Sequence, residues 1–315
     1  MNATGDSRII GWLLDGDPAV RWQAMRDLLH APERTWRREQ LRVAEMGWGR
    51  RLLDLQRPDG NWGRGLYRPK WTCTTYTMQL LRQLGLPAGN ASALRACALY
   101  LDEGVGRDGG INFWQPRRRI GEACVRGMIL AQLSWFAVDD DRIEALMEYV
   151  LREQMPDGGW NCRRPQGATH SSFHTTTNVL EGLQEYVAAK RSRAADALEA
   201  AARGREFLLQ HRLFRSHTTG RVVSSEMTRF HFPPQWRHDA LRALDLFRAG
   251  EDRDRRLEDS VALVRSRRGR DGRWGFARPY PGAVHFTLEA PGAPSRINTL
   301  RALRVLGWWD RRDGA

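Results

Sequence analysis

Three side chains of the kinds that bind zinc stand near the starts of two predicted helices, and a fourth lies between them. Glu122 and Cys124 open one apolar helical pattern, His174 opens the next, and Cys162 lies in the loop between them. A carboxylate, a thiolate and an imidazole leave one position of a tetrahedral zinc open, which is typical of a catalytic metal. With Cys162 as a fourth ligand the site would be closed and structural. The alternative is a buried thiol and a hydrogen-bonded histidine, both common in protein cores.

A second polar group precedes another predicted helix. His238 could act there as a general base, with Asp239 or Glu226 orienting its ring. Glu289, before the last predicted helix, is a weaker carboxylate of the same kind. A packing role explains these positions about as well. The candidate catalytic residues are therefore Glu122, His174, His238 and Asp239.

Basic and aromatic residues gather at the same helix starts. Lys70 precedes one of them, three consecutive arginines lead to Glu122, and Arg163 and Arg164 follow Cys162. With helix N-termini beside them, such residues can hold a diphosphate or another anion, and a solvated loop is the alternative. The candidate substrate-binding residues are Lys70, Trp71, Tyr76, Arg117, Arg119, Asn178, Trp236 and Arg296.

An internal repeat determines where these residues stand. Its copies are Asp59-Gly60-Asn61-Trp62, Asp108-Gly109-Gly110-Ile111, Asp157-Gly158-Gly159-Trp160 and Asp271-Gly272-Arg273-Trp274. The first two intervals are 49 residues (108 − 59 and 157 − 108), and the last, 114, is twice 57, so one copy has decayed. Each copy ends one helical pattern, where glycine suits the turn, and precedes another. The interval from Cys124 to His174 is 50 residues, which predicts matching positions on neighbouring helices.

The repeat predicts an all-α protein of five to six helical hairpins. The second helix of each hairpin is expected to begin near Thr72, Gly121, Phe173, Gln235 and Ser295, and prolines precede several of these starts. Residues 6–31 and 34–56 are predicted as further helices, and no long strand-like alternation competes with them. Such hairpins can stack into an open superhelix or close into a ring. We expect N-terminal helices over 1–47 that pack on a toroid over 48–315, within one compact unit.

The repeat resembles that of a known superfamily. Gln56-x3-Gly60-x-Trp62 and Gln154-x3-Gly158-x-Trp160 match the repeat of squalene and oxidosqualene cyclases, and a third copy has Arg268 in place of glutamine. The resemblance covers roughly residues 48–310 and implies an α/α toroid, the fold shared with protein prenyltransferase β subunits. It also implies that the inner helices begin at the mouth of a central cavity. In this motif we expect the glutamine amide to bond helix-end backbone and the tryptophan ring to pack over the next turn.

Two features of the superfamily can be sought in this chain. Glu122-x-Cys124 and His174-Thr175 resemble the acid-x-Cys and His of the prenyltransferase zinc site, although the family has Asp where Glu122 stands. Class II terpene cyclases protonate an alkene with the middle Asp of Asp-x-Asp-Asp. No such motif occurs here, and His174 falls on that position. An imidazolium is too weak an acid for an unactivated alkene, so the usual class II reaction is not expected.

The composition favours some partners over others. The formal net charge is +13, from 50 Lys and Arg against 37 Asp and Glu, which suits anionic ligands unless it reflects only genomic preference for arginine. No nucleic-acid reader motif is present, so nucleic acid is not expected as a partner. The four separated cysteines, the absence of a signal pattern and the absence of a long apolar run predict a cytoplasmic protein with reduced thiols and no membrane span.

These observations predict a zinc-dependent enzyme that acts on a small, isoprenoid or diphosphate-bearing molecule in a central cavity. The expected cofactor is Zn²⁺. Three alternatives stay open. The chain could be a non-catalytic toroid that binds a ligand or a protein partner. It could be an atypical cyclase without Asp-x-Asp-Asp. It could also be a carbohydrate-active (α/α) barrel, which requires paired carboxylates, and Glu122 with Asp239 or Glu289 are the candidates.

Overall fold

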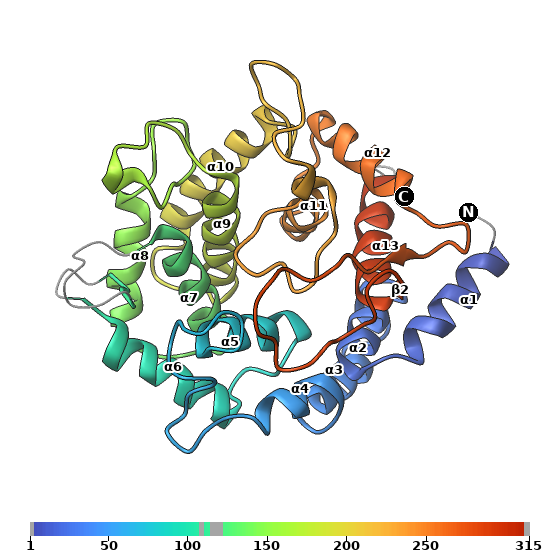
Figure 1. Cartoon of the computed structure of the whole chain (residues 1–315), viewed down its shortest axis with the longest axis horizontal. Coiled ribbons are helices and arrows are strands. Elements are labelled where there is room, and N and C mark those ends of the chain that lie inside the picture. The colour runs from blue at the N-terminus through green and yellow to red at the C-terminus, as the bar shows by residue number, and fades with distance from the viewer. Residues whose placement is uncertain (1–2, 107–109, 114–121, 312–315) are drawn as a thin grey trace.

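Helices form two concentric rings in the computed structural model, which describes residues 3–106, 110–113 and 122–311 (Figure 1). The inner ring consists of α2 (Pro18–Asp27), α5 (Thr74–Leu84), α7 (Ala123–Trp135), α9 (Phe173–Ala188), α11 (Ala240–Ala249) and α13 (Arg296–Asp310). Outside it lie α1 (Ala3–Leu14), α3 (Glu33–Leu41), α4 (Gly47–Leu53), α6 (Ala91–Gly104), α8 (Arg142–Arg152), α10 (Ala194–Gln210) and α12 (Glu258–Ser266). The prediction of an all-α toroid is confirmed.

The inner ring closes where α13 meets α2. Neighbouring inner helices contact one another from α5 through α13, and α13 contacts α2. The Trp22 indole of α2 then donates to the Leu84 carbonyl at the end of α5, at 2.9 Å. The predicted boundary at residue 47 stays a prediction, but α2, which lies before it, supplies one of the six inner helices of the described chain.

The repeat fixes the turns that follow outer helices, and two of its copies also bond the next outer helix. Gln56 Nε2 donates to the carbonyls of Gly60 and Ser92 at 2.9 and 2.8 Å, while the Trp62 indole donates to the Leu52 carbonyl at 2.7 Å. The later copies make equivalent bonds from Gln154, Trp160, Arg268 and Trp274. The turn glycine has a positive φ of 84° at Gly60, a conformation that favours glycine.

Glycines bring α7 and α9 unusually close together. A Cβ atom added to Gly127 would lie 2.6 Å from the Asn178 carbonyl oxygen, and one added to Gly182 would lie 2.6 Å from the Gly127 carbonyl oxygen. Any larger side chain would therefore push the two backbones apart. This contact places the N-termini of α7 and α9, which carry Cys124 and His174, side by side.

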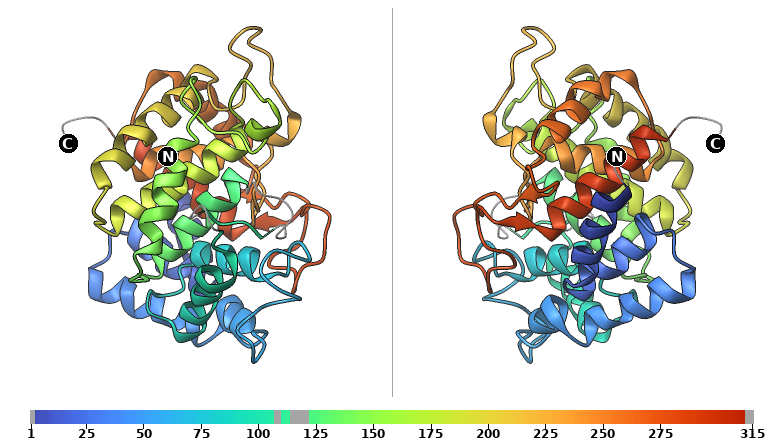
Figure 2. Two further views of the ribbon diagram at one scale, coloured as in Figure 1. Left: turned by 90° about the vertical axis from the view of Figure 1, so that its left-hand side faces the viewer. Right: turned by 90° about the vertical axis from the view of Figure 1, so that its right-hand side faces the viewer.

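Long connections cover the N-terminal ends of the inner helices. The segments 211–239 and 276–293 cross this face, and the second projects from it in the side views (Figure 2). They contain little regular structure beyond the 3₁₀ turn η3 (Ser225–Thr228), and the remaining 3₁₀ turns are η1 (Arg42–Ala44), η2 (Arg164–Gln166) and η4 (Arg255–Leu257). The strands β1 (Trp274–Gly275) and β2 (Pro294–Ser295), which were not predicted, pair antiparallel. Among the described residues, no helix combines the length and apolarity that crossing a bilayer requires.

Candidate functional site

Polar and aromatic side chains meet at the N-termini of α5, α7 and α9. Glu122 immediately precedes α7 and is half-buried. Its Oε2 accepts a hydrogen bond of 3.3 Å from the Tyr67 hydroxyl, which also lies 3.3 Å from the Tyr76 hydroxyl. Burial, aided by neighbouring Tyr76, raises the pKa of Tyr67 far above its ordinary value. The tyrosines therefore remain protonated, and Tyr67 can donate to the carboxylate.

Cys124 and Cys162 lie beside this carboxylate. The Cys162 sulfur accepts from the Cys124 backbone N–H at 3.3 Å and from the Thr175 hydroxyl at 3.4 Å. The Cys124 thiol bonds the same sulfur, which lowers the pKa of Cys162, and that bond and burial raise the pKa of Cys124. The predicted proximity of these residues is thus observed. Both thiols are free, as are those of Cys73 and Cys97.

His174 is turned to a different partner. Its Nδ1 accepts a hydrogen bond of 2.9 Å from the His238 backbone N–H, and its ring packs edge-on against Trp236. Burial lowers the pKa of His174 to about 4, so the ring is neutral at pH 7 and carries its proton on Nε2. Because Nδ1 already accepts this hydrogen bond, it is not free to take a proton from a substrate. The His174 ring is therefore better explained as a structural contact than as a general base acting through Nδ1.

The four predicted metal ligands do not fit a zinc ion as they are placed. Within residues 3–106, 110–113 and 122–311, no group of three or more His, Cys, Asp or Glu side chains could hold a metal ion. Glu122 is bonded to Tyr67, Cys162 to Thr175 and Cys124, and His174 to the backbone of residue 238. Zinc binding by these residues stays a prediction, and no chemical step is assigned to it.

His238 is a packing residue. Its ring is buried, its Nδ1 accepts from the Thr177 hydroxyl at 2.7 Å, and its Nε2 donates to the Leu213 carbonyl at 2.6 Å. Both nitrogens are therefore used, and burial lowers its pKa to about 3. The interpretation of His238 as a general base does not agree with this geometry, because the ring has no free lone pair.

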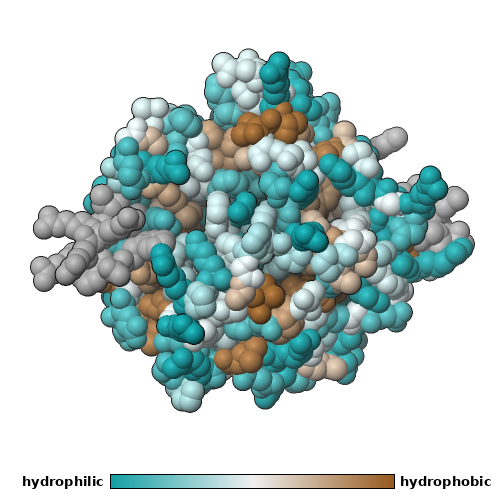
Figure 3. Space-filling model, in the orientation of Figure 1, coloured by the Kyte–Doolittle hydropathy of each residue, from teal (hydrophilic) through white to brown (hydrophobic). Residues whose placement is uncertain are grey.

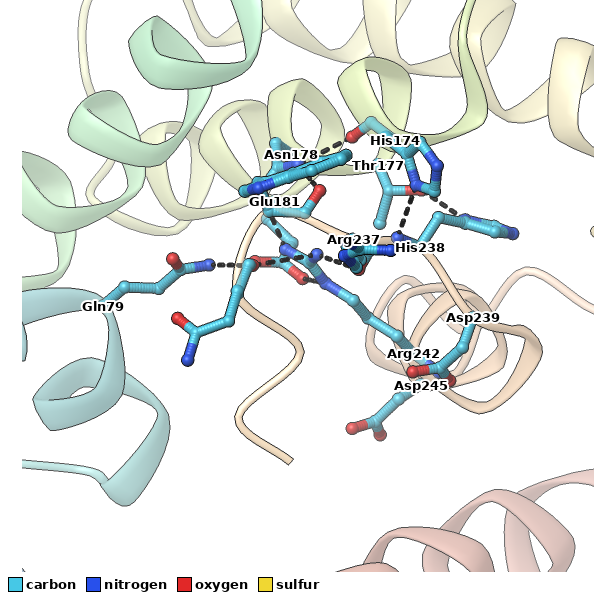
Figure 4. A network of polar contacts seen from close by, with 12 residues as sticks. Gln79, His174, Thr177, Asn178, Glu181, Arg237, His238, Asp239, Arg242 and Asp245 are labelled. Carbon is cyan, nitrogen blue, oxygen red and sulfur yellow. Dashed lines mark hydrogen bonds and ion pairs between the residues drawn. The ribbon is translucent and has the colours of Figure 1, made fainter. Parts of the chain in front are cut away.

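Asp239 and Asn178 belong to a buried polar network (Figure 4). Asp239 Oδ1 caps α11 by accepting from the Arg242 backbone N–H at 2.8 Å. Asn178 donates to the carbonyls of His174 and Trp236 and accepts from Arg242 at 2.9 Å. These bonds satisfy the Asn178 amide, so this residue positions the Trp236 segment instead of facing a substrate.

The predicted groups at α13 also have structural partners. Glu289 accepts from the Ser295 hydroxyl and from the Arg296 backbone N–H at the start of α13. The Arg296 side chain points to α1, where it bonds the Trp12 carbonyl at 2.9 Å and stacks on the Trp12 ring. The carboxylates of Glu122, Asp239 and Glu289 are thus engaged separately, which disfavours the carbohydrate-active barrel. Arg117 and Arg119 lie outside the described residues.

Four aromatic rings surround a cation next to Glu122. The Lys70 ammonium lies 5.2 Å from the ring centre of Tyr67, 5.7 Å from Trp71, and 6.0 Å from both Tyr76 and Trp236. We call these four rings the aromatic cage. Distances of this size allow cation–π attraction. The predicted residues Lys70, Trp71, Tyr76 and Trp236 are therefore brought together, around a cation supplied by the chain itself.

An apolar pocket of about 650 Å³ shares two walls with the aromatic cage. Trp71 and Tyr76 line both, and the rest of the pocket is formed mainly by the segments crossing the ring, including Phe232, Tyr280 and Phe286. The Trp71 indole donates to the Pro281 carbonyl at 3.0 Å, which fixes the ring against the 276–293 segment. Figure 3 shows this face as apolar patches among hydrophilic residues. A ligand with an apolar body and a reactive end would fit this arrangement.

Acidification tests the assignment of His174 and His238. Because burial depresses both pKa values below the unfolded value of about 6.5, only the unfolded chain gains these protons as the pH falls. The free energy of unfolding is therefore expected to fall between about pH 6.5 and pH 4, as measured by urea denaturation. His174→Gln should reduce this fall, whereas His30→Asn, at an exposed position, should leave it unchanged. Identical pH curves for all three proteins would contradict the assignment.

Several residues of this site were not predicted from the sequence. Tyr67 was missed, although it stands three positions before Lys70, and so were Tyr280 and Phe286 of the long crossing segment. The charged residues inside the ring were missed as well. The sequence does contain a pattern that could have indicated them. Five inner helices carry a charged residue eight positions after their first residue (for example, 82 − 74), namely Arg26, Arg82, Glu181, Arg248 and Arg304.

Comparisons with known proteins give structural likeness only. No protein-family model matches the sequence, and no curated protein matches it. A variant of the type II terpene cyclase MstE from Scytonema, in complex with geranylgeranyl dihydroxybenzoate, has a TM-score of 0.47 at 16% identity, over 93% of this chain and 87% of that one. Apo MstE has a TM-score of 0.45 at 17% identity, over 92% and 88% of the two chains.

Proposed function

We propose that this chain is an enzyme that converts an apolar, isoprenoid-like small molecule through a positively charged intermediate, as in terpenoid cyclisation or prenyl transfer. One observation carries the proposal. The aromatic cage already holds a cation, and its Trp71 and Tyr76 walls continue into the apolar pocket. A hydrocarbon chain can lie in the pocket while its reacting carbon lies against the rings, whose faces attract positive charge.

Ionisation of an allylic diphosphate would supply that charge without a strong acid. The carbon–oxygen bond breaks, its electron pair leaves with the diphosphate, and the allylic carbon becomes positive. The Lys70 ammonium leaves the aromatic cage to pair with the diphosphate, and the carbocation takes its place. Glu122, held by Tyr67, then accepts a proton from a neighbouring carbon. A carbon–carbon double bond forms there, and the product is neutral.

Diphosphate release tests this function. The purified chain is expected to release diphosphate from an allylic prenyl diphosphate of ten, fifteen or twenty carbons. Tyr76→Leu should lower the rate about 30-fold, because a desolvated cation–π contact contributes about 2 kcal/mol. Tyr76→Phe, which keeps the ring, should retain most of the activity. Product analysis by mass spectrometry would distinguish cyclisation from simple elimination.

The same diphosphate-release assay provides a control variant and distinguishes the rival function, a non-catalytic toroid that binds a ligand. Trp309→Leu, at a half-buried position at the end of α13, should release diphosphate at the rate of the unaltered chain. Binding of the prenyl diphosphate without any release would favour a non-catalytic, ligand-binding toroid. The buried, fully bonded state of His238 is the observation that favours this second function. Equal rates for Tyr76→Leu and the unaltered chain would remove the aromatic cage from the mechanism.

A further inference from the structure

A second and larger cavity lies towards the C-terminal ends of the inner helices. It encloses about 1020 Å³, and residues of α2, α5, α9, α11 and α13 line it. The charged residues eight positions into these helices, Arg26, Arg82, Glu181, Arg248 and Arg304, all contribute to its wall. At 1.5 Å per residue, these positions lie about 12 Å below the helix starts. The cavity is thus separate from the aromatic cage, although Phe232 borders both this cavity and the apolar pocket.

Positive charge exceeds negative charge around this cavity. Six arginines line it against the three carboxylates of Glu181, Glu185 and Asp245. Asp27 pairs with two of these arginines, and the buried Asp239 acts on Arg301, so five carboxylates face six arginines and one positive charge remains (6 − 5). Burial raises the pKa of Glu185, which weakens its contribution further. The lining is therefore suited to a ligand that carries negative charge.

Among the described residues, Arg301 forms no direct ion pair, although the buried carboxylates of Asp239 and Asp245 act on it from a longer distance. It is 6% exposed and lines the cavity from α13. Its Nη1 donates to the His231 carbonyl and to Asn298 Oδ1, each at a long 3.3 Å. In the described part of the chain, no Asp or Glu forms an ion pair with this guanidinium, whereas Arg82, Arg242 and Arg304 each have at least one. A buried charge in this position is costly unless an anion reaches it.

We propose that this cavity binds a small organic anion bearing a phosphate group, with Arg301 as its anchor. The planar guanidinium offers two parallel N–H groups, a geometry that matches phosphate oxygens. Arg82 Nε is buried without a hydrogen-bond partner and supplies a second donor within the wall. Trp22, Trp135 and Leu300 give the cavity apolar surface for the organic part of the ligand. The proposal does not depend on the proposed function, because neither Lys70 nor Glu122 nor any ring of the aromatic cage lines this cavity.

Calorimetric titration of the full chain with inorganic diphosphate and with phenyl phosphate tests the site. Both probes are expected to bind, and Arg301→Gln should weaken each by about 10- to 100-fold, the usual effect of a lost hydrogen bond to a charged group. Arg301→Lys keeps the charge and should bind with intermediate affinity. Near-UV circular dichroism would show whether each variant keeps its fold.

Matched variants distinguish this site from other basic surfaces. Arg265→Gln, which removes an exposed arginine of α12 paired with Asp310, should bind both probes as the unaltered chain does. If Arg301→Gln does not fold, Arg248→Gln at the same cavity provides a second test and should weaken binding. Equal affinity in the unaltered chain and Arg301→Gln would overturn the proposal. If Lys70→Gln weakens binding of the probes and Arg301→Gln does not, the anion binds at the aromatic cage.

Discussion

Replacing Glu181 by alanine is expected to lower the free energy of unfolding by about 3–5 kcal/mol, the usual cost of removing one partner of a buried ion pair. Glu181 accepts from Arg82 at 2.7 Å and from Arg242 at 2.6 Å, and so ties α5, α9 and α11 together inside the ring. Without this carboxylate, Arg242 would lose its only acidic partner among the described residues and remain buried. Arg82 would keep Glu185 alone.

Urea denaturation at pH 7 measures this effect. Glu181→Gln, which keeps an acceptor but loses the charge, should fall between alanine and the unaltered chain. Glu199→Ala removes a carboxylate that is paired with Arg203 on the exposed face of α10, and it should change the free energy of unfolding by less than about 1 kcal/mol. A similar small effect for Glu181→Ala would mean that the buried network contributes little to stability.

The same network predicts a second acid response. Burial alone would raise the pKa of Glu181, but Arg242 and Arg82 reverse this and hold it below its ordinary value. The resulting stability is present above the unfolded pKa of about 4.3 and is lost as the pH falls through the lower folded value. Glu181→Gln should therefore flatten the stability curve below about pH 4, a range distinct from that of the two histidines.

Trp160→Ala is expected to destabilise the chain by a comparable amount, about 3–5 kcal/mol, the cost of truncating a large buried aromatic residue. The ring is fully buried, its indole donates to the Val150 carbonyl at 2.8 Å, and its backbone N–H donates to the Thr176 hydroxyl at 3.0 Å. Loss of the ring leaves both a cavity and an unpaired carbonyl between α8 and α10.

Thermal and urea unfolding would measure the loss at Trp160. Trp160→Phe should recover part of it, since the smaller ring fills some of the space but cannot donate to Val150. Trp36→Ala, which removes a half-buried indole of α3, should cost clearly less. Equal effects at Trp36 and Trp160 would show that the repeat tryptophans have no special role in stability.

The fold could be predicted because its repeat is local. The glutamine, glycine and tryptophan of the two full copies lie within seven residues, and their hydrogen bonds reach back to the same hairpin or forward to the next helix. The spacing of these copies therefore gave the hairpins and their approximate starts. The start before α11 was placed near Gln235, whereas the helix begins at Ala240, because residues 231–239 form an irregular segment inside the ring.

The site could be predicted only in part. The spacing of one repeat and the close packing at Gly127 place Glu122 and Cys124 in one region of the structure. Their neighbours there are Cys162, Lys70 and Tyr76. Spacing gives no information on the direction of a ring. The orientation of His174 depends on the His238 backbone N–H, which is 64 residues away and belongs to an irregular segment.

Polar residues near helix starts were also predicted to be catalytic where the structure shows a structural role. Asp239 caps α11, as short polar side chains at such positions commonly do. Glu289 supports the start of α13 by accepting from the Arg296 backbone N–H and from the hydroxyl of Ser295, the residue that caps this helix. The sequence pattern is the same for a capping carboxylate and for a catalytic one. Only the positions of neighbouring donors separate the two, and these come from residues distant in sequence.

Closure of the ring through α2 has a kinetic consequence. Arg304 bonds Gln23 at 2.8 Å across 281 residues of chain, whereas Arg203 bonds Gln154, one repeat away, across 49. Bringing the ends of the longer loop together costs about 1.5 kcal/mol more in chain entropy. Contacts between adjacent hairpins are therefore expected to form first during folding, and contacts across the α2–α13 seam are among those of longest sequence separation. The toroid is expected to pass through an open, C-shaped array of hairpins before its two ends meet.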